Sequence, residues 1–305
     1  RMNTPIIDFV KEYEQKNMAR FHMPGHKGKN FLGVEMYDIT EIDGADVLGT
    51  ADGIIAESEN NASVLFGTGH TYYTTQGSTT AICAMLALVK KQNGIILAAR
   101  NVHKAFVHAC ALLDMDVQWL YGENLLSCLI TPAELDSFLQ EHDVSAVYLT
   151  SPDYLGNVAD IQGLSEVCRR YGVLLAVDNA HGAYLKFFGR HPLELGADIC
   201  CDSAHKTLPV LTGGAYLHIS SAASALFAEN AERALALFAS TSPSYLTLQS
   251  LDACNAYLND GFAADLVRCC DEVKALKEAI LIHGYDLVGD EPLKITVATK
   301  GHGYT

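Results

Sequence analysis

The chain has 305 residues, of which 49% are hydrophobic and 19% charged, a globular composition that excludes a disordered protein. Its formal net charge of −15 disfavours nucleic-acid binding by bulk charge but is compatible with a small cationic substrate. The nine cysteines include no CxxC spacing, so neither a disulfide framework nor a zinc site is expected, and no metal is predicted. We expect a cytoplasmic protein with reduced thiols that does not act at a membrane. No signal peptide is visible, and no apolar run reaches the ~18 residues of a membrane span.

In chain order, the pattern begins with a helix at 4–20 and an irregular loop at 21–28 that is rich in glycine, proline and polar residues. A helix at 56–66 and a strand at 70–75 follow. Strands are then expected at 94–99, 115–120, 144–150, 173–177, 198–201 and 214–219, and helices at 78–92, 103–113, 132–141 and 161–171. The chain closes with one or two helices over 246–283 and strands at 285–288 and 293–298. This alternation predicts an α/β fold with a mainly parallel sheet, in which ligands bind at the carboxyl ends of the strands.

Three regions are expected. Residues 1–40 form an N-terminal arm and loop, and residues 41–283 form the large ligand-binding domain. Residues 284–305 are the start of a smaller C-terminal domain that the sequence does not complete, because it stops just after a strand with no helix to pack on it.

The loop around Lys206 is the first candidate site. It follows the buried strand 198–201, and lysine is rare between core strands. A lysine amine in an enclosed site can form a Schiff base, and the neighbouring Ser203 and His205 can donate to a phosphate. The alternative is an ordinary exposed loop lysine.

Asp178 ends the strand 173–177, and His181 follows three residues later. The carboxylate is either a helix cap or the partner of a protonated pyridine nitrogen, the usual acidic partner of pyridoxal 5′-phosphate (PLP). His181 is then in position to flank a bound ring.

The strand-to-helix junction at 74–81 is an anion-binding candidate. Gly77 permits a tight turn, and the free N–H groups of Ser78, Thr79 and Thr80 would point at an anion. Ordinary helix capping is the alternative, and the pattern is neither GxGxxG nor a P-loop. His103, after the strand 94–99, could stack on an aromatic cofactor or simply cap a helix.

These signals in this order along the chain are more specific for a function than any one of them alone. An anion loop, a stacking histidine, a strand-end aspartate and a lysine 28 residues after it supply the parts of a PLP enzyme.

The motifs together resemble the Orn/Lys/Arg decarboxylase family, in its short form without an N-terminal receiver-like wing. The resemblance covers nearly the whole chain, and the matching stretches are Phe21-His22-Met23-Pro24-Gly25-His26-Lys27-Gly28, Asn101–Lys104, Asp178–His181, Ser203-Ala204-His205-Lys206-Thr207-Leu208-Pro209 and Thr241-Ser242-Pro243-Ser244-Tyr245. It implies an aminotransferase-like PLP fold (fold type I). It also implies decarboxylation of arginine, lysine or ornithine in polyamine metabolism, and a homodimer with active sites at the subunit interface.

The resemblance also implies roles for residues. Lys206 would hold the cofactor as a Schiff base, Asp178 would pair with the pyridine nitrogen, His103 would stack on the ring and His181 would lie near the imine. The phosphate would be held by Ser78, Thr79, Ser203 and His205. Either Lys206 or His205 would return a proton to Cα. Four residues would approach a site of the partner chain: His26, Lys27, Ser242 and Ser244.

Two stretches depart from the family pattern. Gln76-Gly77-Ser78-Thr79-Thr80 stands where Asn-Gly-Thr-Ser-Thr is expected, and Asn179 stands where glutamate is expected. The alternatives are another PLP reaction, such as that of an aminotransferase or a lyase, or a catalytically silent homologue. A metal site of His22 and His26 is disfavoured, because Pro24 and Gly25 break the helical spacing that it needs.

Overall fold

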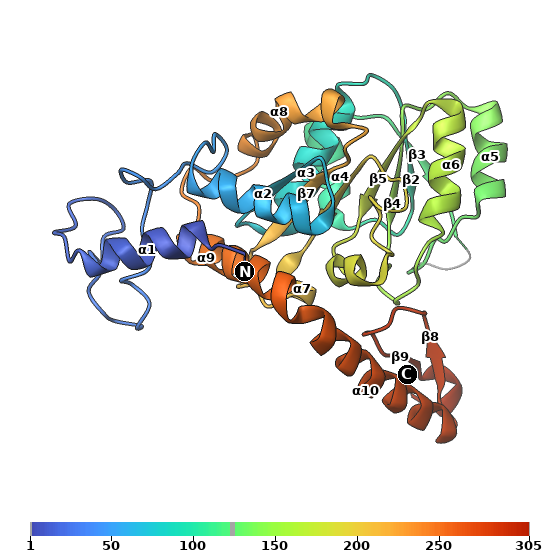
Figure 1. The fold of residues 1–305 in the computed structure, drawn as a ribbon. Coiled ribbons are helices and arrows are strands. Elements are labelled where there is room, and N and C mark those ends of the chain that lie inside the picture. Colours follow the sequence, from blue (N-terminus) through green and yellow to red (C-terminus); the bar gives the residue numbers. More distant parts are fainter. Residues whose placement is uncertain (1, 123–125, 305) are drawn as a thin grey trace.

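The computed structural model describes residues 2–122 and 126–304, and its centre is a seven-stranded sheet with helices on both faces (Figure 1). The strands of this sheet, in chain order, are β1 His70–Thr74, β2 Ile96–Ala99, β3 Val117–Leu120, β4 Ala146–Thr150, β5 Leu174–Asp178, β6 Ile199–Asp202 and β7 Ala215–Ile219. Their spatial order is β1-β7-β6-β5-β4-β2-β3. Every pairing is parallel except that β7 runs antiparallel to β6 and to β1. The predicted α/β fold with a mainly parallel sheet is confirmed.

The helices are α1 Pro5–Gln15, α2 Ile54–Phe66, α3 Gly77–Lys90, α4 Lys104–Leu112, α5 Pro132–Glu141, α6 Ile161–Tyr171, α7 Ala204–Thr207, α8 Ser224–Ala236, α9 Tyr245–Asp260 and α10 Phe262–Ile282. Two 3-10 turns, η1 Ala183–Phe188 and η2 Lys300–His302, and a separate hairpin of β8 Asp286–Val288 and β9 Thr296–Ala298 complete the chain.

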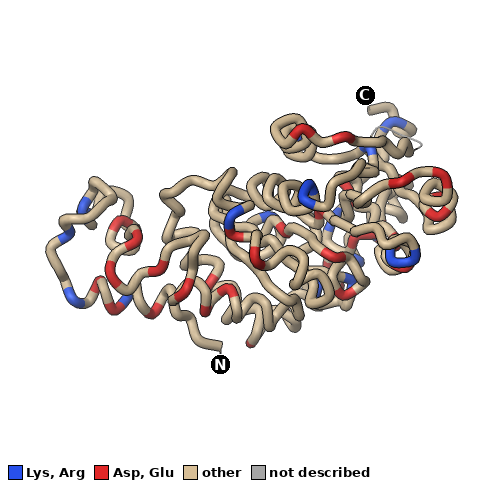
Figure 2. Tube along the Cα trace, turned by 90° about the horizontal axis from the view of Figure 1, so that it is seen from above, with Lys and Arg blue, Asp and Glu red and all other residues tan. Residues whose placement is uncertain are grey.

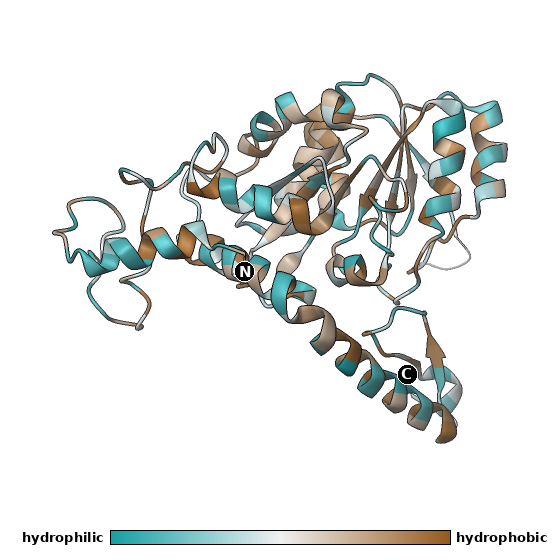
Figure 3. Ribbon diagram, viewed as in Figure 1, coloured by the Kyte–Doolittle hydropathy of each residue, from teal (hydrophilic) through white to brown (hydrophobic). Residues whose placement is uncertain are grey.

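The alternation of side chains along a strand divides the core into two faces. In β4, Ala146 and Tyr148 pack into the cluster formed with α3, α4 and α8, whereas Val147 and Leu149 pack into the cluster formed with α5 and α6. The sheet is therefore buried on both sides, which explains its apolar runs. In Figure 3 the central strands of the sheet are mostly brown, while α5 and α6 show teal on their outer sides.

Local signals set several boundaries as expected. The α5 helix opens on a capping box in which Thr131 and Glu134 each accept a hydrogen bond from the other's backbone N–H. The α6 helix begins and ends where the pattern predicted, with Asp160 capping its start and Gly172 its end.

Three expectations need correction, and one alternative is decided. The helix predicted over 4–20 ends at Gln15, because the backbone turns to a positive φ of 45° at Asn17. Of the one or two helices expected over 246–283, the structure has two, separated at Gly261. The α8 helix was not predicted, although its buried residues 227, 231, 234 and 235 have helical spacing. Lys206 lies in the one-turn helix α7 and not in a loop.

The two ends of the chain extend away from the sheet in Figure 1. The long helix α10 buries only Phe262 and Leu266 and leads to the β8–β9 hairpin. Residues 16–53 form no regular helix or strand and leave several apolar side chains exposed: Met18, Phe21, Met23, Phe31 and Leu32. The division into three regions stays a prediction.

Acidic residues are distributed along most of the trace and not gathered at one place (Figure 2). Within the part of the chain that the structure describes, no helix is both long and apolar enough to cross a membrane.

Candidate active site

A cavity of about 410 Å³ opens at the carboxyl edge of the central strands. Thr150 and Asp178, the last residues of β4 and β5, line it, as does Arg100, which follows β2. This is where ligands bind in open α/β sheets. Five of the predicted site residues line the cavity: Ser78, His103, Asp178, His181 and Lys206. The fold thus brings together residues that are up to 128 positions apart in the sequence.

Asp178 is the buried acid of this cavity, with 2% of its surface exposed. Its Oδ1 accepts the backbone N–H of Ala180 at 3.1 Å and lies 3.6 Å from the thiol of Cys201. Burial raises the pKa of Asp178, and the positive charge of Lys206 only partly opposes this effect. The carboxylate forms no ion pair with any described residue, so a cationic group bound in the cavity would stabilise its charged form.

Lys206 and His181 are in direct contact, with 3.3 Å between Nζ and Nε2. Burial lowers the pKa of His181 to about 4, and the charge of Lys206 contributes to the shift. The imidazole is therefore neutral at pH 7 and accepts a hydrogen bond from the lysine. The side chain of Lys206 is exposed in the single chain, so the enclosed position that the sequence suggested is not seen.

His103 combines the two roles that its position suggested. Its Nδ1 accepts the N–H of Ala105 at 3.1 Å and so caps α4, while the residue also lines the cavity. Burial lowers the pKa of His103, which favours a neutral ring. A neutral imidazole on the cavity wall suits stacking on an aromatic ligand.

The first turn of α3 has backbone N–H groups that no side chain caps. The backbone turns at Gly77 with φ +78°, and no side chain caps this helix. The N–H of Gly77 donates to the carbonyl of Gly213 at 2.7 Å. A Cβ on Gly213 would lie 2.4 Å from the carbonyl of Thr75, so only glycine permits this approach. The exposed donors and the helix dipole at Ser78 suit an anion.

Three predicted phosphate ligands do not line the cavity. Thr79 is exposed on α3. Ser203 is buried with its Oγ 3.4 Å from Nδ1 of His205, and that nitrogen is 3.2 Å from the carbonyl of Gly214. Ser203 and His205 thus lie next to the glycine segment that contacts the start of α3. Their contact with a phosphate stays a prediction.

The cavity also contains polar groups that the sequence reasoning did not select. The side-chain oxygens Asn101 Oδ1 and Thr150 Oγ1 are buried and have no hydrogen-bond partner among the described residues. Unpaired buried oxygens are costly, and they mark places where a ligand supplies the missing partner. Thr150 could have been found from its place at the end of a buried strand, the same signal that identified Asp178.

A second cavity of about 510 Å³ shares His181 and Lys206 with the first. Glu291 and Lys294 from the C-terminal segment line it. The Nζ of Lys294 lies 5.0 Å from the ring centroid of Tyr154, which lines the first cavity. Residues beyond 284 therefore reach the candidate site, a role that the sequence did not assign to any one of them.

The residues predicted to approach a partner's site lie outside both cavities. His26 Nε2 is 3.2 Å from a carboxylate oxygen of Asp38, and Lys27 Nζ donates to the carbonyl of His22 at 2.6 Å. Ser242 is exposed. Ser244 caps α9, and its N–H lies 3.4 Å from Thr75 Oγ1, close to the turn at Gly77.

Comparison with known proteins identifies the family. The model of the Orn/Lys/Arg decarboxylase major domain matches residues 4–282. The uncharacterized protein YaaO of Bacillus subtilis is 31% identical over all of this chain and 69% of its own length. An arginine decarboxylase of Halalkalibacterium halodurans is 28% identical over 99% of this chain and 67% of its own length.

Solved structures show the same fold. The lysine decarboxylase LdcF of Francisella novicida superposes with a TM-score of 0.77 at 18% identity, over 96% of this chain and 47% of that chain. Lysine decarboxylase A of Pseudomonas aeruginosa gives 0.73 at 20% identity, over 90% and 43%. The chain spans less than half the length of these two structures. The predicted aminotransferase-like fold of PLP enzymes, fold type I, is confirmed, and the chain belongs to the Orn/Lys/Arg decarboxylase family.

Proposed function

We propose that this protein is a PLP-dependent decarboxylase that converts a basic amino acid to its amine and CO₂. The observation that carries the proposal is the contact between Lys206 and the neutral His181, in a cavity that also holds the buried Asp178. A lysine, a neutral base and an acid with a raised pKa are the groups that amino-acid chemistry at Cα requires.

The donor set fits PLP. The uncapped first turn of α3 with Ser78 suits the phosphate, and the carboxylate of Asp178 suits the pyridine nitrogen. His103 offers a neutral ring to stack on the cofactor, and Lys206 the amine that holds it. The unpaired Thr150 Oγ1 and Asn101 Oδ1 leave further positions for polar groups of the cofactor or the substrate.

When bound, PLP supplies the electron sink that makes loss of CO₂ from Cα feasible. Asp178 would stabilise a positive charge on the pyridine nitrogen of the bound cofactor, and that charge would in turn stabilise the buried carboxylate. Lys206 donates the proton that replaces the carboxylate at Cα, and His181 accepts from Lys206 and orients it. His205 is a weaker candidate for this donor, because it lies outside the cavity lining.

Product analysis tests the proposal. We expect the full-length protein, supplied with PLP and with arginine, lysine or ornithine in separate reactions, to release CO₂ and the corresponding amine from at least one of them. Aspartate and glutamate serve as matched acidic substrates that should give no product. Formation of a keto acid would instead indicate an aminotransferase, and PLP binding without turnover of any amino acid would indicate a silent homologue.

We further propose a homodimer whose subunits complete each other's sites. The N-terminal loop with His26 and Lys27 lies away from the chain's own cavities and carries the exposed apolar residues Phe21, Phe31 and Leu32, with exposed fractions of 95%, 77% and 86%. An apolar surface of this kind is typical of a subunit interface.

Mixing two inactive variants tests the composite site. H26A and K206A should be inactive alone. Their mixture should recover up to about a quarter of wild-type activity, because half of randomly formed dimers are mixed and each mixed dimer has one intact site. A mixture of K206A with D178N is the control and should stay inactive, since both changes affect the same site. Lack of rescue by H26A after confirmed subunit exchange would place the loop outside the partner's site.

A reducing compartment, and hence the cytoplasm, is part of the proposal. All nine cysteines are free thiols and seven of them are buried. Free buried thiols are typical of proteins that are kept under reducing conditions.

A further inference from the structure

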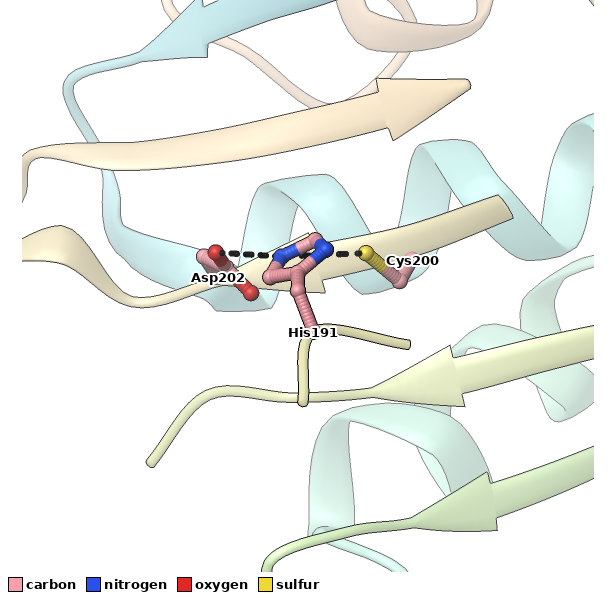
Figure 4. Close-up of side chains that lie close together, drawn as sticks. All are labelled: His191, Cys200 and Asp202. Atoms are coloured by element: carbon pink, nitrogen blue, oxygen red, sulfur yellow. Dashed lines mark hydrogen bonds and ion pairs between the residues drawn. The ribbon is translucent and has the colours of Figure 1, made fainter. Parts of the chain in front are cut away.

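Four polar side chains form a buried cluster beneath the candidate site. Asp202 ends β6, and one of its oxygens, Oδ2, is 3.1 Å from Nε2 of His191 and 3.2 Å from Nε2 of His218. Its other oxygen accepts the side-chain amide of Asn179 at 2.6 Å. All four residues have 0% of their surface exposed. Figure 4 shows the imidazole of His191 between Asp202 and Cys200.

The hydrogen bonds assign the protons of the cluster. Nδ1 of His218 is 2.8 Å from the hydroxyl of Thr71, and Nδ1 of His191 accepts the N–H of Leu193 at 3.4 Å. Because an ionised carboxylate can only accept, both Nε2 atoms donate to Asp202. Burial alone would raise the pKa of Asp202, but the two imidazoles outweigh it and hold the pKa well below its usual value. Burial lowers the pKa of His218. The cluster thus stabilises one buried carboxylate with three donors.

A metal ion is the alternative occupant of this cluster. The ligating atoms of His191, Cys200 and Asp202 lie within 4.8 Å of one another. However, the Nε2 atoms are already occupied as donors to Asp202, and burial raises the pKa of Cys200, which favours a thiol over the thiolate that zinc binds. The hydrogen bonds satisfy the carboxylate without an ion.

The position of the cluster connects it to the site. Asn179 directly follows Asp178, and Asp202 is followed by Ser203, the residue just before the one-turn helix of Lys206. The bond between Asn179 and Asp202 therefore joins the two segments that carry the acid and the lysine. Because β5 and β6 pair in parallel, their carboxyl ends lie side by side. The hydrogen bond between the side chains of Asn179 and Asp202 joins the next residue of each segment, just beyond the last backbone pairing.

The same bond explains a departure from the family pattern. Glutamate is expected at position 179, but a second carboxylate against Asp202 would place two negative charges in contact inside the core. An amide donates to the carboxylate instead. The space around the side chain of Asn179 is closely limited, because a Cβ added to Gly182 would lie only 2.2 Å from its Oδ1. A larger side chain at 179 would also meet this neighbour.

We propose that Asn179 and Asp202 are positioning residues: their acid–amide pair, held by His191 and His218, sets the position of Asp178 relative to Lys206. The catalytic consequence of this proposal rests on the proposed function. The hydrogen-bonded pair itself does not depend on that function. It favours one acid and one amide at these two positions, because two carboxylates would repel each other and two amides would leave the buried imidazole N–H groups without a charged acceptor.

A reciprocal exchange tests the pair in the full-length protein. In N179D two carboxylates meet. The melting temperature of the cofactor-free protein should fall, and in the PLP-loaded protein the pH dependence of the bound cofactor's absorbance should shift. The turnover number should drop by about 100-fold with KM little changed, the size expected of a small misplacement of catalytic groups. The exchange N179D/D202N restores one acid and one amide and should recover most of the melting temperature and of the absorbance profile.

The control is D252N. Asp252 is also fully buried and accepts the N–H groups of Ile6 and Ile7 and the hydroxyl of Ser58, away from the cavity. This variant should change the melting temperature, because it alters a buried acid and its hydrogen bonds, without moving the absorbance profile. The proposal would be overturned if N179D/D202N melted at no higher temperature than N179D. It would also be overturned if N179D, like D252N, left the absorbance profile unchanged. One zinc per chain in the purified protein would replace it with a metal site. If the wild type binds no PLP, the proposed function fails, while the melting temperatures of the wild type, N179D, D202N and N179D/D202N still test the pair as a double-mutant cycle.

Discussion

K206A should lose covalent attachment of the cofactor, and its turnover should fall by several orders of magnitude. Lys206 is the amine that contacts the neutral His181, and no other lysine of the cavity has this contact in the part of the chain described. Removing it deletes both the attachment and the proposed proton donor. Borohydride treatment of the wild type should fix PLP to the peptide that contains Lys206, and peptide mass mapping would detect it.

Lys104 provides the matched control for this prediction. It lines the same cavity, at the start of α4, and is exposed. K104A should keep the cofactor attached and retain the borohydride-labelled peptide. Labelling that moves to Lys104, or that persists in K206A, would show that the assignment of the cofactor lysine is wrong.

D178N should keep the fold and the bound PLP but lose turnover by several orders of magnitude. The amide cannot hold a charge on the pyridine nitrogen, so the electron sink is weakened, whereas the anion-binding turn of α3 is unchanged. Turnover and the fraction of PLP bound should be measured on the same samples. Turnover near that of the wild type would mean that Asp178 only accepts the backbone N–H of Ala180 and has no role in catalysis.

The cofactor-free form of D178N should also be at least as stable as the wild type at neutral pH. Because burial raises the pKa of Asp178, the folded protein binds its proton more tightly than the unfolded chain does. The stability contributed by the protonated acid is present at low pH and is lost as the pH rises through the raised pKa. D178N should lack this loss in a pH series of melting curves.

Asp198 is the control for the stability measurement. Burial raises its pKa as well, and its Oδ2 accepts the N–H of Leu175 at 2.8 Å at the opposite end of the same strand. D198N should alter the melting temperature without reducing the turnover number. A large loss of turnover in D198N would show that any change in the buried charge of this sheet disturbs the site.

Local sequence determined most of the regular elements. The strands are short runs of apolar residues that are buried on both faces, and such runs differ clearly from the 3.6-residue spacing of the helices. Caps and breakers such as Thr131, Asp160 and Gly172 set the ends of α5 and α6. Where a positive φ at Asn17 or the break at Gly261 decided a boundary, the sequence was ambiguous, because asparagine and glycine also occur inside helices.

The sequence by itself also selected candidate groups that line one cavity, because Ser78, strand-end Asp178 and Lys206 occur in a specific order and within specific motifs. Only the tertiary structure decided which of them meet. It placed His181 against Lys206, left Ser203 and His205 outside the cavity, and added Thr150 and Lys294. It also showed that Asn179 and Asp202, which are 23 positions apart, are a single hydrogen-bonded unit. The physical reason is that strand ends separated in sequence become neighbours only when the sheet forms, and side-chain distances depend on that packing and not on local propensity.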